Sequence, residues 1–213
     1  MRPVIVLFAK APLAGRVKTR LSPPLPPELA ARLHDAFVRD TLESLHSLDN
    51  SADVELHTDI PTDAWGDIAV PRKVQHEGDL GLKMLQALDD ALKTGRERVM
   101  IVGSDSPTLP VSHLELLLRA QDDVALGPTL DGGFYAIACT RVHPRMFDGV
   151  RWSAADTLDR TVRAIRACGL TVTQGAAWYD VDTPEDLERL ASDPRLSPRT
   201  AAVLEACKNG SFL

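Results

Sequence analysis

The segment Val4-Ile5-Val6-Leu7-Phe8 is a continuous run of apolar residues, three of them β-branched. A run of this kind is typical of a strand that is buried on both faces within a parallel sheet. Val99-Met100-Ile101-Val102 has the same character, and helical patterns at 28–48 and 84–92 lie between the two runs. Because strands alternate with helices, the sequence predicts an α/β sandwich.

Further patterns extend this alternation. We expect shorter strands at 54–57, 73–75, 124–126, 134–139 and 170–173, and helices at 114–118 and 153–168. The run at 134–139 follows its predecessor too closely for a crossover helix, so it must be antiparallel to a neighbour, and the sheet must be mixed. Ser153 and Asp156 form a capping-box pattern, which predicts that the helix over 153–168 begins at Ser153.

Length and charge limit the classes to which the chain can belong. Its 213 residues favour one domain over 1–213, with a helical tail at 194–213, since domains average roughly 150 residues. The 24 basic and 30 acidic side chains give a net charge of −6, which argues against a nucleic-acid partner. No apolar run approaches the ~18 residues of a membrane span, and the first residues do not form a signal peptide. We therefore expect a cytoplasmic protein with no membrane partner.

Cysteines and histidines add no metal or nucleophile site. Cys139, Cys168 and Cys207 are widely spaced, so neither a disulfide framework nor a thiolate metal site is expected. The six histidines show no zinc-binding spacing and support no Ser-His-Asp triad. His34 and His46 lie in a predicted helix, and we expect both at the surface. The leucine-rich helices fit core burial and an interface equally well, so the oligomeric state stays open.

Four polar or glycine-rich segments follow the predicted strands, where open α/β sheets bind ligands. The first, Lys10–Arg20, carries four cations in an otherwise acidic chain. Gly15 allows close backbone approach, so Lys10, Lys18 and Arg20 are candidate ligands for a pyrophosphate. The segment matches neither the GxxxxGK(S/T) nor the GxGxxG phosphate loop. A solvated basic loop is the alternative interpretation.

The second segment, Gly103-Ser104-Asp105-Ser106-Pro107, follows the second apolar run. Asp105 is a candidate ligand for a divalent ion that bridges phosphates, or it caps the turn before the next helix. The third segment contains Asp131-Gly132-Gly133. A glycine pair beside a carboxylate fits backbone packed against a sugar, with Asp131 accepting hydroxyl hydrogen bonds, and it also fits a tight hairpin. Both interpretations can hold together.

The fourth segment precedes the last helical region. Thr183, followed by a proline and by Asp186 three positions on, is the pattern of a helix N-terminus. This leaves Asp180 and Asp182 without a structural role, and one of them is a candidate second metal ligand. Solvated carboxylates before a helix are the alternative. Trp152 is a candidate to flank a ligand, although a buried aromatic is the commoner role.

Six motifs stand in order between residues 3 and 190. They are Phe8-Ala9-Lys10-Ala11-Pro12 with Gly15, Lys18, Thr19 and Arg20; Gly78-Asp79-Leu80-Gly81; Gly103-Ser104-Asp105-Ser106-Pro107; Gly127-Pro128 with Asp131-Gly132-Gly133-Phe134-Tyr135; Trp152-Ser153; and Asp180-Val181-Asp182-Thr183. The set resembles the bacterial DUF2064 family, which is glycosyltransferase-like, of the arsenosugar-biosynthesis type. Its wider relatives are nucleotidyltransferases of the molybdenum-cofactor and 2-phospholactate guanylyltransferase kind. After Gly81 the family pattern continues with an acid and an arginine, whereas this chain has Leu82 and Lys83.

The resemblance implies a fold and a set of ligands. The fold is that of nucleotide-diphospho-sugar transferases (GT-A), a three-layer α/β/α sandwich with a mixed, mostly parallel sheet. The implied ligands are nucleotide phosphates near Lys10, Gly15, Lys18, Arg20 and Ser104, and Mg²⁺ or Mn²⁺ near Asp105 and Asp182.

The leading hypothesis is a metal-dependent glycosyltransferase that uses a nucleotide sugar and a small-molecule acceptor. In this hypothesis Asp105 and Asp182 bind the metal, and Lys10, Lys18 and Arg20 neutralise the leaving group. Asp131 orients or deprotonates the acceptor. Gly132, Gly133 and Trp152 surround the acceptor or the sugar. One alternative is a nucleotidyltransferase that moves NMP from an NTP to a phosphorylated or alcohol acceptor. The other is a non-catalytic nucleotide-binding module, which only Leu82 and Lys83 favour.

Overall fold

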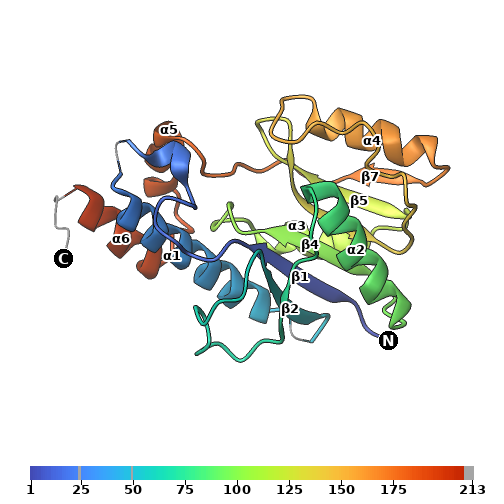
Figure 1. The fold of residues 1–213 in the computed structure, drawn as a ribbon, viewed down its shortest axis with the longest axis horizontal. Coiled ribbons are helices and arrows are strands. Elements are labelled where there is room, and N and C mark those ends of the chain that lie inside the picture. Colours follow the sequence, from blue (N-terminus) through green and yellow to red (C-terminus); the bar gives the residue numbers. More distant parts are fainter. Residues whose placement is uncertain (24, 49, 209–213) are drawn as a thin grey trace.

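The computed structural model describes residues 1–23, 25–48 and 50–208 (Figure 1). Its strands are β1 (Val4–Ala9), β2 (Asp53–Thr58), β3 (Arg72–Val74), β4 (Val99–Gly103), β5 (Val124–Pro128), β6 (Phe134–Cys139) and β7 (Val172–Gln174). Its helices are α1 (Pro27–His46), α2 (Leu80–Lys93), α3 (Val111–Leu118), α4 (Thr157–Ala167), α5 (Pro184–Ala191) and α6 (Pro198–Lys208), with a short 3₁₀ helix, η1 (Thr19–Leu21). None of the described helices is long and apolar enough to cross a membrane.

The strands form a seven-stranded sheet in the order β3-β2-β1-β4-β6-β5-β7. β6 is antiparallel to both β4 and β5, and the other pairs are parallel. The prediction of a mixed, mostly parallel sheet is therefore confirmed. β7 begins at Val172, two residues later than predicted, and Leu170, which is 5% exposed, packs into the core before the strand starts.

Helices cover both faces of the sheet. α1 and α3 cover one face, in a cluster that includes Leu7, Leu42, Met100 and Leu117. α2 and α4 cover the other, in a cluster that includes Val6, Leu88, Ile101 and Ile165. Successive residues of a strand point to opposite faces, so β1 supplies both clusters, and each fully buried Leu or Ile stabilises the fold by roughly 1.5–3 kcal/mol. The three-layer sandwich is confirmed.

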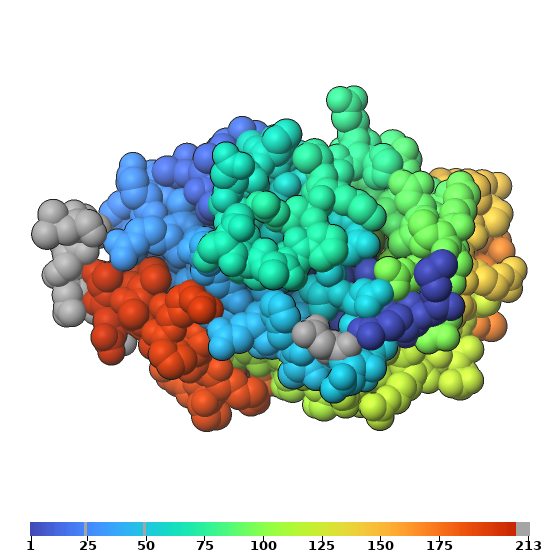
Figure 2. Space-filling view, turned by 90° about the horizontal axis from the view of Figure 1, so that it is seen from below, coloured from blue at the N-terminus to red at the C-terminus, as the bar shows by residue number. Residues whose placement is uncertain are grey.

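The chain beyond β7 runs along the carboxyl edge of the sheet, where Trp178 pairs with Thr129 and the Val181 N–H donates to the Asp105 carbonyl. A third apolar cluster joins α1 to this region and includes Leu33, Phe37, Tyr179, Val181, Leu190 and Leu204. α6 lies against α1 (Figure 2). It accounts for most of the predicted helical tail, whose residues 209–213 lie outside the described part of the chain. Thr183 and Asp186 form the predicted capping box at the start of α5.

The predicted capping box at Ser153 is wrong. α4 begins at Thr157, and Ser153 has a left-handed backbone with φ 56°. The Thr157 hydroxyl instead accepts from the Ala154 N–H at 3.2 Å. The Leu158 N–H donates to the Gly132 carbonyl at 2.8 Å, so the first turn of α4 is docked on the β5–β6 hairpin. A local capping pattern has been overridden by this tertiary contact.

The strand order predicts a crevice between β1 and β4, where successive strands are added on opposite sides of β1. β1 is followed along the chain by β2 on one side, whereas β4 lies on its other side, with Phe8 opposite Gly103 at the carboxyl ends. Ligands of open α/β sheets bind at such a switch point. The two segments that begin at Lys10 and Ser104 therefore start side by side.

Candidate active site

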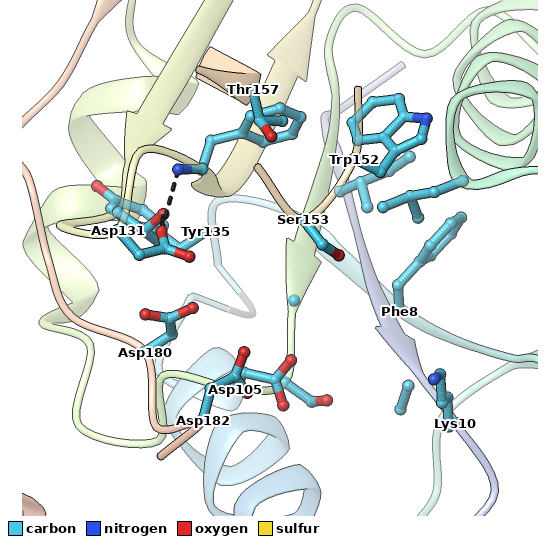
Figure 3. A pocket seen from close by; sticks show the side chains of 18 of the residues that line it. Phe8, Lys10, Asp105, Asp131, Tyr135, Trp152, Ser153, Thr157, Asp180 and Asp182 are labelled. Carbon is cyan, nitrogen blue, oxygen red and sulfur yellow. Dashed lines mark hydrogen bonds between the residues drawn. The ribbon is translucent and has the colours of Figure 1, made fainter. Parts of the chain in front are cut away.

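A cavity of about 730 Å³ opens beyond the carboxyl ends of β1 and β4 (Figure 3). All four predicted segments line it: Lys10, Arg16, Lys18 and Arg20 after β1, Gly103, Ser104 and Asp105 at the end of β4, Asp131 and Gly133 in the β5–β6 hairpin, and Asp180 and Asp182 before α5. Trp152 also lines it. Gly15 and Gly132 are not among the described residues at its surface.

Lys18 is the most buried of the cations at this cavity. Its side chain is 4% exposed, and its ammonium pairs with Asp105 and, at 3.2 Å, with Asp182. It also donates a hydrogen bond to the Val181 carbonyl at 2.7 Å. Burial alone lowers the pKa of Lys18, but the two carboxylates outweigh burial and hold that pKa above its ordinary value. Lys18 therefore carries its charge at neutral pH.

Apolar neighbours explain why Lys18 is buried within a basic segment. Val17 is 3% exposed and Leu21 is fully buried, so the chain on both sides of Lys18 is anchored in the core. The Lys18 ammonium lies 5.4 Å from the centre of the Phe37 ring. Arg20 remains outside, with a side chain that is 62% exposed. The segment is thus not simply a solvated basic loop.

Asp105 covers Lys18 from the end of β4. Its side chain is 49% exposed, so one part of the carboxylate contacts Lys18 while another part meets solvent in the cavity. Burial opposes its ionisation, but the neighbouring Lys18 outweighs burial and lowers the pKa of Asp105. The alternative role as a helix cap does not apply, because α3 begins at Val111 and its N-cap residue is Pro110.

The segment before α5 brings two further carboxylates to the cavity. Val181 is fully buried in the cluster between α1 and α5, and its N–H donates to the Asp105 carbonyl at 2.9 Å. Asp180 and Asp182, on either side of Val181, both line the cavity. The expectation that Asp182 has no structural role is wrong, because it pairs with Lys18 and lies 3.8 Å from Arg20.

The β5–β6 connection is a tight hairpin that also reaches the cavity. The Asp131 carboxylate accepts from the Thr129 hydroxyl at 2.5 Å and from the Gly133 N–H at 3.0 Å. Gly132 has a φ of 93°, and its carbonyl holds the start of α4. The turn therefore fixes Asp131, which still lines the cavity, so the two interpretations of this segment are compatible.

Two aromatic side chains and Lys10 lie across the cavity from the carboxylates of Asp131, Asp180 and Asp182 (Figure 3). The two aromatic residues are Phe8 and Trp152. Trp152 is partly buried and meets Phe134 and Phe147 edge-on, with ring centres 6.3 and 5.8 Å apart. It is therefore both a packed aromatic and a cavity residue.

Several residues that line the cavity were not identified from the sequence, His34, Asp59 and Lys83 among them. His34 is 3% exposed and lines the cavity, so its prediction as a surface residue is wrong. Its spacing from Ala30 and Phe37 places it on the apolar face of α1, which is the signal that could have identified it. Lys83 also lines the cavity, whereas Leu82 is 44% exposed and is not among the described lining residues.

Two of the cavity carboxylates, Asp105 and Asp182, lie where a divalent ion could bind together with a phosphate. Among the residues that the structure describes, no three His, Cys, Asp or Glu side chains are grouped so as to hold a metal ion together. Asp105 and Asp182 nevertheless contact the same ammonium, so they lie close together at the cavity. Mg²⁺ commonly takes only one or two protein carboxylates together with substrate phosphates. The pair therefore fits an ion that binds with a phosphorylated ligand rather than an all-protein cage.

The fold defines a structural class. The mixed, mostly parallel sheet covered by helices is a fold shared with nucleotidyltransferases and nucleotide-diphospho-sugar transferases of known structure. Residues 47–154 match the model of the family described as "Uncharacterized protein conserved in bacteria (DUF2064)", and the chain belongs to this family. The resemblance found in the sequence is thereby confirmed.

Two relatives place the chain among transferases, and a third shares the fold. A crystal structure from Desulfovibrio desulfuricans G20, provisionally assigned as a nucleotide-diphospho-sugar transferase, is 33% identical with a TM-score of 0.86, over 98% of this chain and 96% of that chain. The 2-phospho-L-lactate guanylyltransferase of Haloarcula marismortui is 28% identical over 177 residues, which is 83% of this chain and 81% of the relative. A CMP:2-keto-3-deoxy-manno-octonic acid synthetase complexed with CTP is 15% identical with a TM-score of 0.54, over 96% of this chain and 100% of that chain, and shows the fold alone.

The pKa of Asp180 provides a test of the repulsion among the carboxylates that line the cavity. Burial, followed by repulsion from Asp131 and Asp182, raises the pKa of Asp180 from 3.8 to about 6. The folded state therefore binds a proton more tightly than the unfolded state, and the ionisation of Asp180 removes stability as the pH rises from about 4 to 6. We expect Asp180→Asn to stabilise the protein by about 1–2 kcal/mol at pH 7.5 and by much less at pH 4.

The measurement is urea unfolding at both pH values in a buffer that contains EDTA. Asp182→Asn is the matched control, because it removes a carboxylate that pairs with Lys18 and should destabilise the protein at pH 7.5. An Asp180→Asn variant that is less stable than the parent at pH 7.5 would show that Asp180 is not under electrostatic strain.

Proposed function

We propose that this chain is a transferase that acts on a nucleotide-activated donor, with a nucleotide sugar as the leading donor. The observation that carries the proposal is the buried ammonium of Lys18 between Asp105 and Asp182, in a cavity that Lys10 and Arg20 also line. Cations grouped beside carboxylates suit a diphosphate together with a divalent ion. The identity of 33% to a provisional nucleotide-diphospho-sugar transferase supports the same donor.

The donor side of the site is the basic segment after β1. Transfer of a sugar breaks the bond between its anomeric carbon and the diphosphate, so negative charge develops on the leaving diphosphate. Lys10 and Arg20 would neutralise this charge, and Lys18 would hold Asp105 and Asp182 in place beneath it. Charges that are positioned before the reaction stabilise the transition state without reorganisation.

The acceptor side is the hairpin and the segment before α5. Asp131 is held by Thr129 and Gly133, so it is already oriented when an acceptor arrives. An acceptor hydroxyl would donate its hydrogen bond to Asp131, which either orients it or takes its proton. Gly133 and Trp152 line the same cavity and would contact the sugar or the acceptor.

Asp105 and Asp182 would hold Mg²⁺ or Mn²⁺ with the donor phosphates. When bound, the ion supplies positive charge to the phosphate oxygens. We expect turnover to be lost in EDTA and restored by Mg²⁺, which tests the metal independently of the sugar.

A donor panel tests the proposed function. Thermal melting would be measured with UDP-sugars, GDP-sugars and the four NTPs, each with Mg²⁺, because a ligand that binds the folded state raises its melting temperature. Each donor that shifts the melting temperature is then incubated with sugar and alcohol acceptors. We expect a nucleotide sugar to bind and to yield free nucleoside diphosphate. Absence of both binding and product with every donor would overturn the proposal.

Nucleotidyl transfer is the second candidate. It is favoured by the 28% identity to a 2-phospho-L-lactate guanylyltransferase, and the basic segment also suits a triphosphate. In this case an acceptor oxygen attacks the α-phosphorus and pyrophosphate leaves. The same panel separates the two reactions, because release of pyrophosphate from an NTP identifies the nucleotidyltransferase.

Asp105→Asn should lower turnover roughly 100-fold, equivalent to about 2.7 kcal/mol of lost transition-state stabilisation. The amide retains the shape of the side chain, but its neutral oxygen neither pairs with Lys18 as a charge nor binds Mg²⁺ strongly. The measurement is kcat/KM across a Mg²⁺ titration, in which the Mg²⁺ requirement should rise. Asp89→Asn, at a surface ion pair with Lys93, is the control and should change nothing. Normal turnover with a normal Mg²⁺ requirement would mean that Asp105 is not a metal ligand.

A further inference from the structure

The peptide between Lys10 and Ala11 is the first beyond the end of β1, and side chains from two other elements hold it. The Lys10 carbonyl oxygen lies 2.9 Å from Nε2 of His34, which belongs to α1. The Ala11 N–H donates to Oδ1 of Asp59 at 2.7 Å, just beyond the end of β2. Both polar groups of this peptide are therefore satisfied by side chains, at the point where the sheet no longer supplies partners.

The chemistry of the His34 bond is determined by its partner. A carbonyl oxygen only accepts hydrogen bonds, so Nε2 of His34 must carry the proton and donate it. His34 is 3% exposed, and Nδ1 of its ring is buried without a hydrogen-bond partner among the described residues. Burial lowers the pKa of His34 below its ordinary value, which keeps the ring neutral.

Packing alone does not explain a histidine at this position. His34 meets Trp65 edge-on in an otherwise apolar part of α1, where a leucine would fill the same space without a buried unpartnered nitrogen. What a leucine cannot supply is the hydrogen bond to the Lys10 carbonyl. The function of His34 is therefore to be sought in the segment that it holds.

We propose that His34 and Asp59 are positioning residues that clamp the Lys10–Ala11 peptide and thereby set the affinity of the site for phosphate groups. The clamp fixes the backbone from which Lys10 projects towards the cavity, and both His34 and Asp59 line that cavity themselves. A fixed backbone spares the ligand the entropy of ordering the loop when it binds. This inference rests on the proposed nucleotide-donor function.

The test uses inorganic pyrophosphate, which is the chemistry common to both candidate donors. Isothermal titration calorimetry with Mg²⁺ compares the parent chain with His34→Leu and His34→Gln. Leucine removes the hydrogen bond, and we expect it to weaken pyrophosphate binding roughly 5- to 10-fold, the usual worth of one such bond. Glutamine can place an amide N–H near Nε2, so it should restore binding to within about twofold of the parent.

His46→Leu is the matched control. It lies on the same helix, and its Nδ1 is 2.7 Å from the Leu42 carbonyl, but it is exposed and is not among the described cavity residues. Binding of pyrophosphate should be unchanged in this variant. With an active donor, the loss in His34→Leu should appear in the KM for the donor and not in kcat.

Variants of Asp59 provide an independent test of the clamp if His34→Leu does not fold. Asp59→Asn and Asp59→Ala are both uncharged, but only asparagine retains an oxygen that can accept from the Ala11 N–H. We expect alanine to bind pyrophosphate roughly 5-fold more weakly than asparagine. Equal binding by this pair, or by His34→Leu and the parent, overturns the clamp while the proposed function stands. A parent chain that binds no pyrophosphate overturns the clamp as a determinant of phosphate affinity, and the donor panel then decides the proposed function separately.

Discussion

Replacing Lys18 with methionine is expected to lower donor turnover roughly 1,000-fold, the largest functional effect of any single substitution in the site. Methionine fills a similar volume but leaves Asp105 and Asp182 close together with no cation between them. The two carboxylates then repel each other and move apart. The site loses both its fixed positive charge and the arrangement of the carboxylates expected to hold the metal.

The measurement is single-turnover kinetics with the best donor from the panel. Lys93→Met is the control, because Lys93 pairs with Asp89 at the exposed surface and should leave turnover unchanged. Unfolding in urea separates loss of function from loss of structure. We expect Lys18→Met to lower the free energy of unfolding by no more than about 2 kcal/mol. The reason is that the side chains of Asp105 and Asp182 are 49% and 36% exposed and remain hydrated. Turnover within tenfold of the parent would contradict the central role of Lys18.

Much of the fold follows from the apolar runs. Val4–Phe8 and Val99–Val102 are buried strands because their side chains supply both faces of the sheet, and their parallel pairing places the polar segments after them at one edge. This is why Asp105 and the basic segment could be expected at one cavity. The capping box at Thr183 was also predictable, because its partners lie within four residues.

The different burial and roles of the three cations could not be predicted from the sequence. Spacing along the chain groups Lys10, Lys18 and Arg20 as equivalent phosphate ligands, whereas the structure buries Lys18 and leaves Arg20 exposed. The reason is tertiary, because Lys18 donates to the carbonyl of Val181, which is 163 residues away in the sequence. No local pattern reports such a contact.

The failed capping box at Ser153 has a similar cause. The sequence pattern there is as good as the one at Thr183, but the chain before α4 packs against the Gly132 turn, and Ser153 takes a left-handed conformation. The His34 assignment failed for another reason. A histidine is expected at the surface because its ring is polar, but His34 lies on the apolar face of α1, and its one hydrogen bond allows the ring to be buried.

Gly132→Ala is expected to produce the largest loss of stability, about 3–5 kcal/mol. Two effects add at this position. Gly132 has a φ of 93°, which residues with a side chain rarely adopt, and a Cβ placed there would lie 2.1 Å from the Ala155 carbonyl oxygen. Because that oxygen belongs to the backbone, the hairpin and the chain before α4 must move apart. The bond from the Leu158 N–H to the Gly132 carbonyl would be strained as well.

Gly149→Ala separates the two effects. Gly149 has a φ of 72° but nothing within 4 Å of an added Cβ, so its substitution should cost only about 1 kcal/mol of backbone strain. Unfolding in guanidinium gives the loss of stability of each variant, and the difference between the two losses is the cost of the contact between the added Cβ and the Ala155 carbonyl. At a temperature where Gly132→Ala is still folded, Asp131 should be displaced, which would raise the KM for the acceptor more than that for the donor. Equal costs for the two glycines would mean that the hairpin yields easily, and the turn could then not be what holds Asp131 in the cavity.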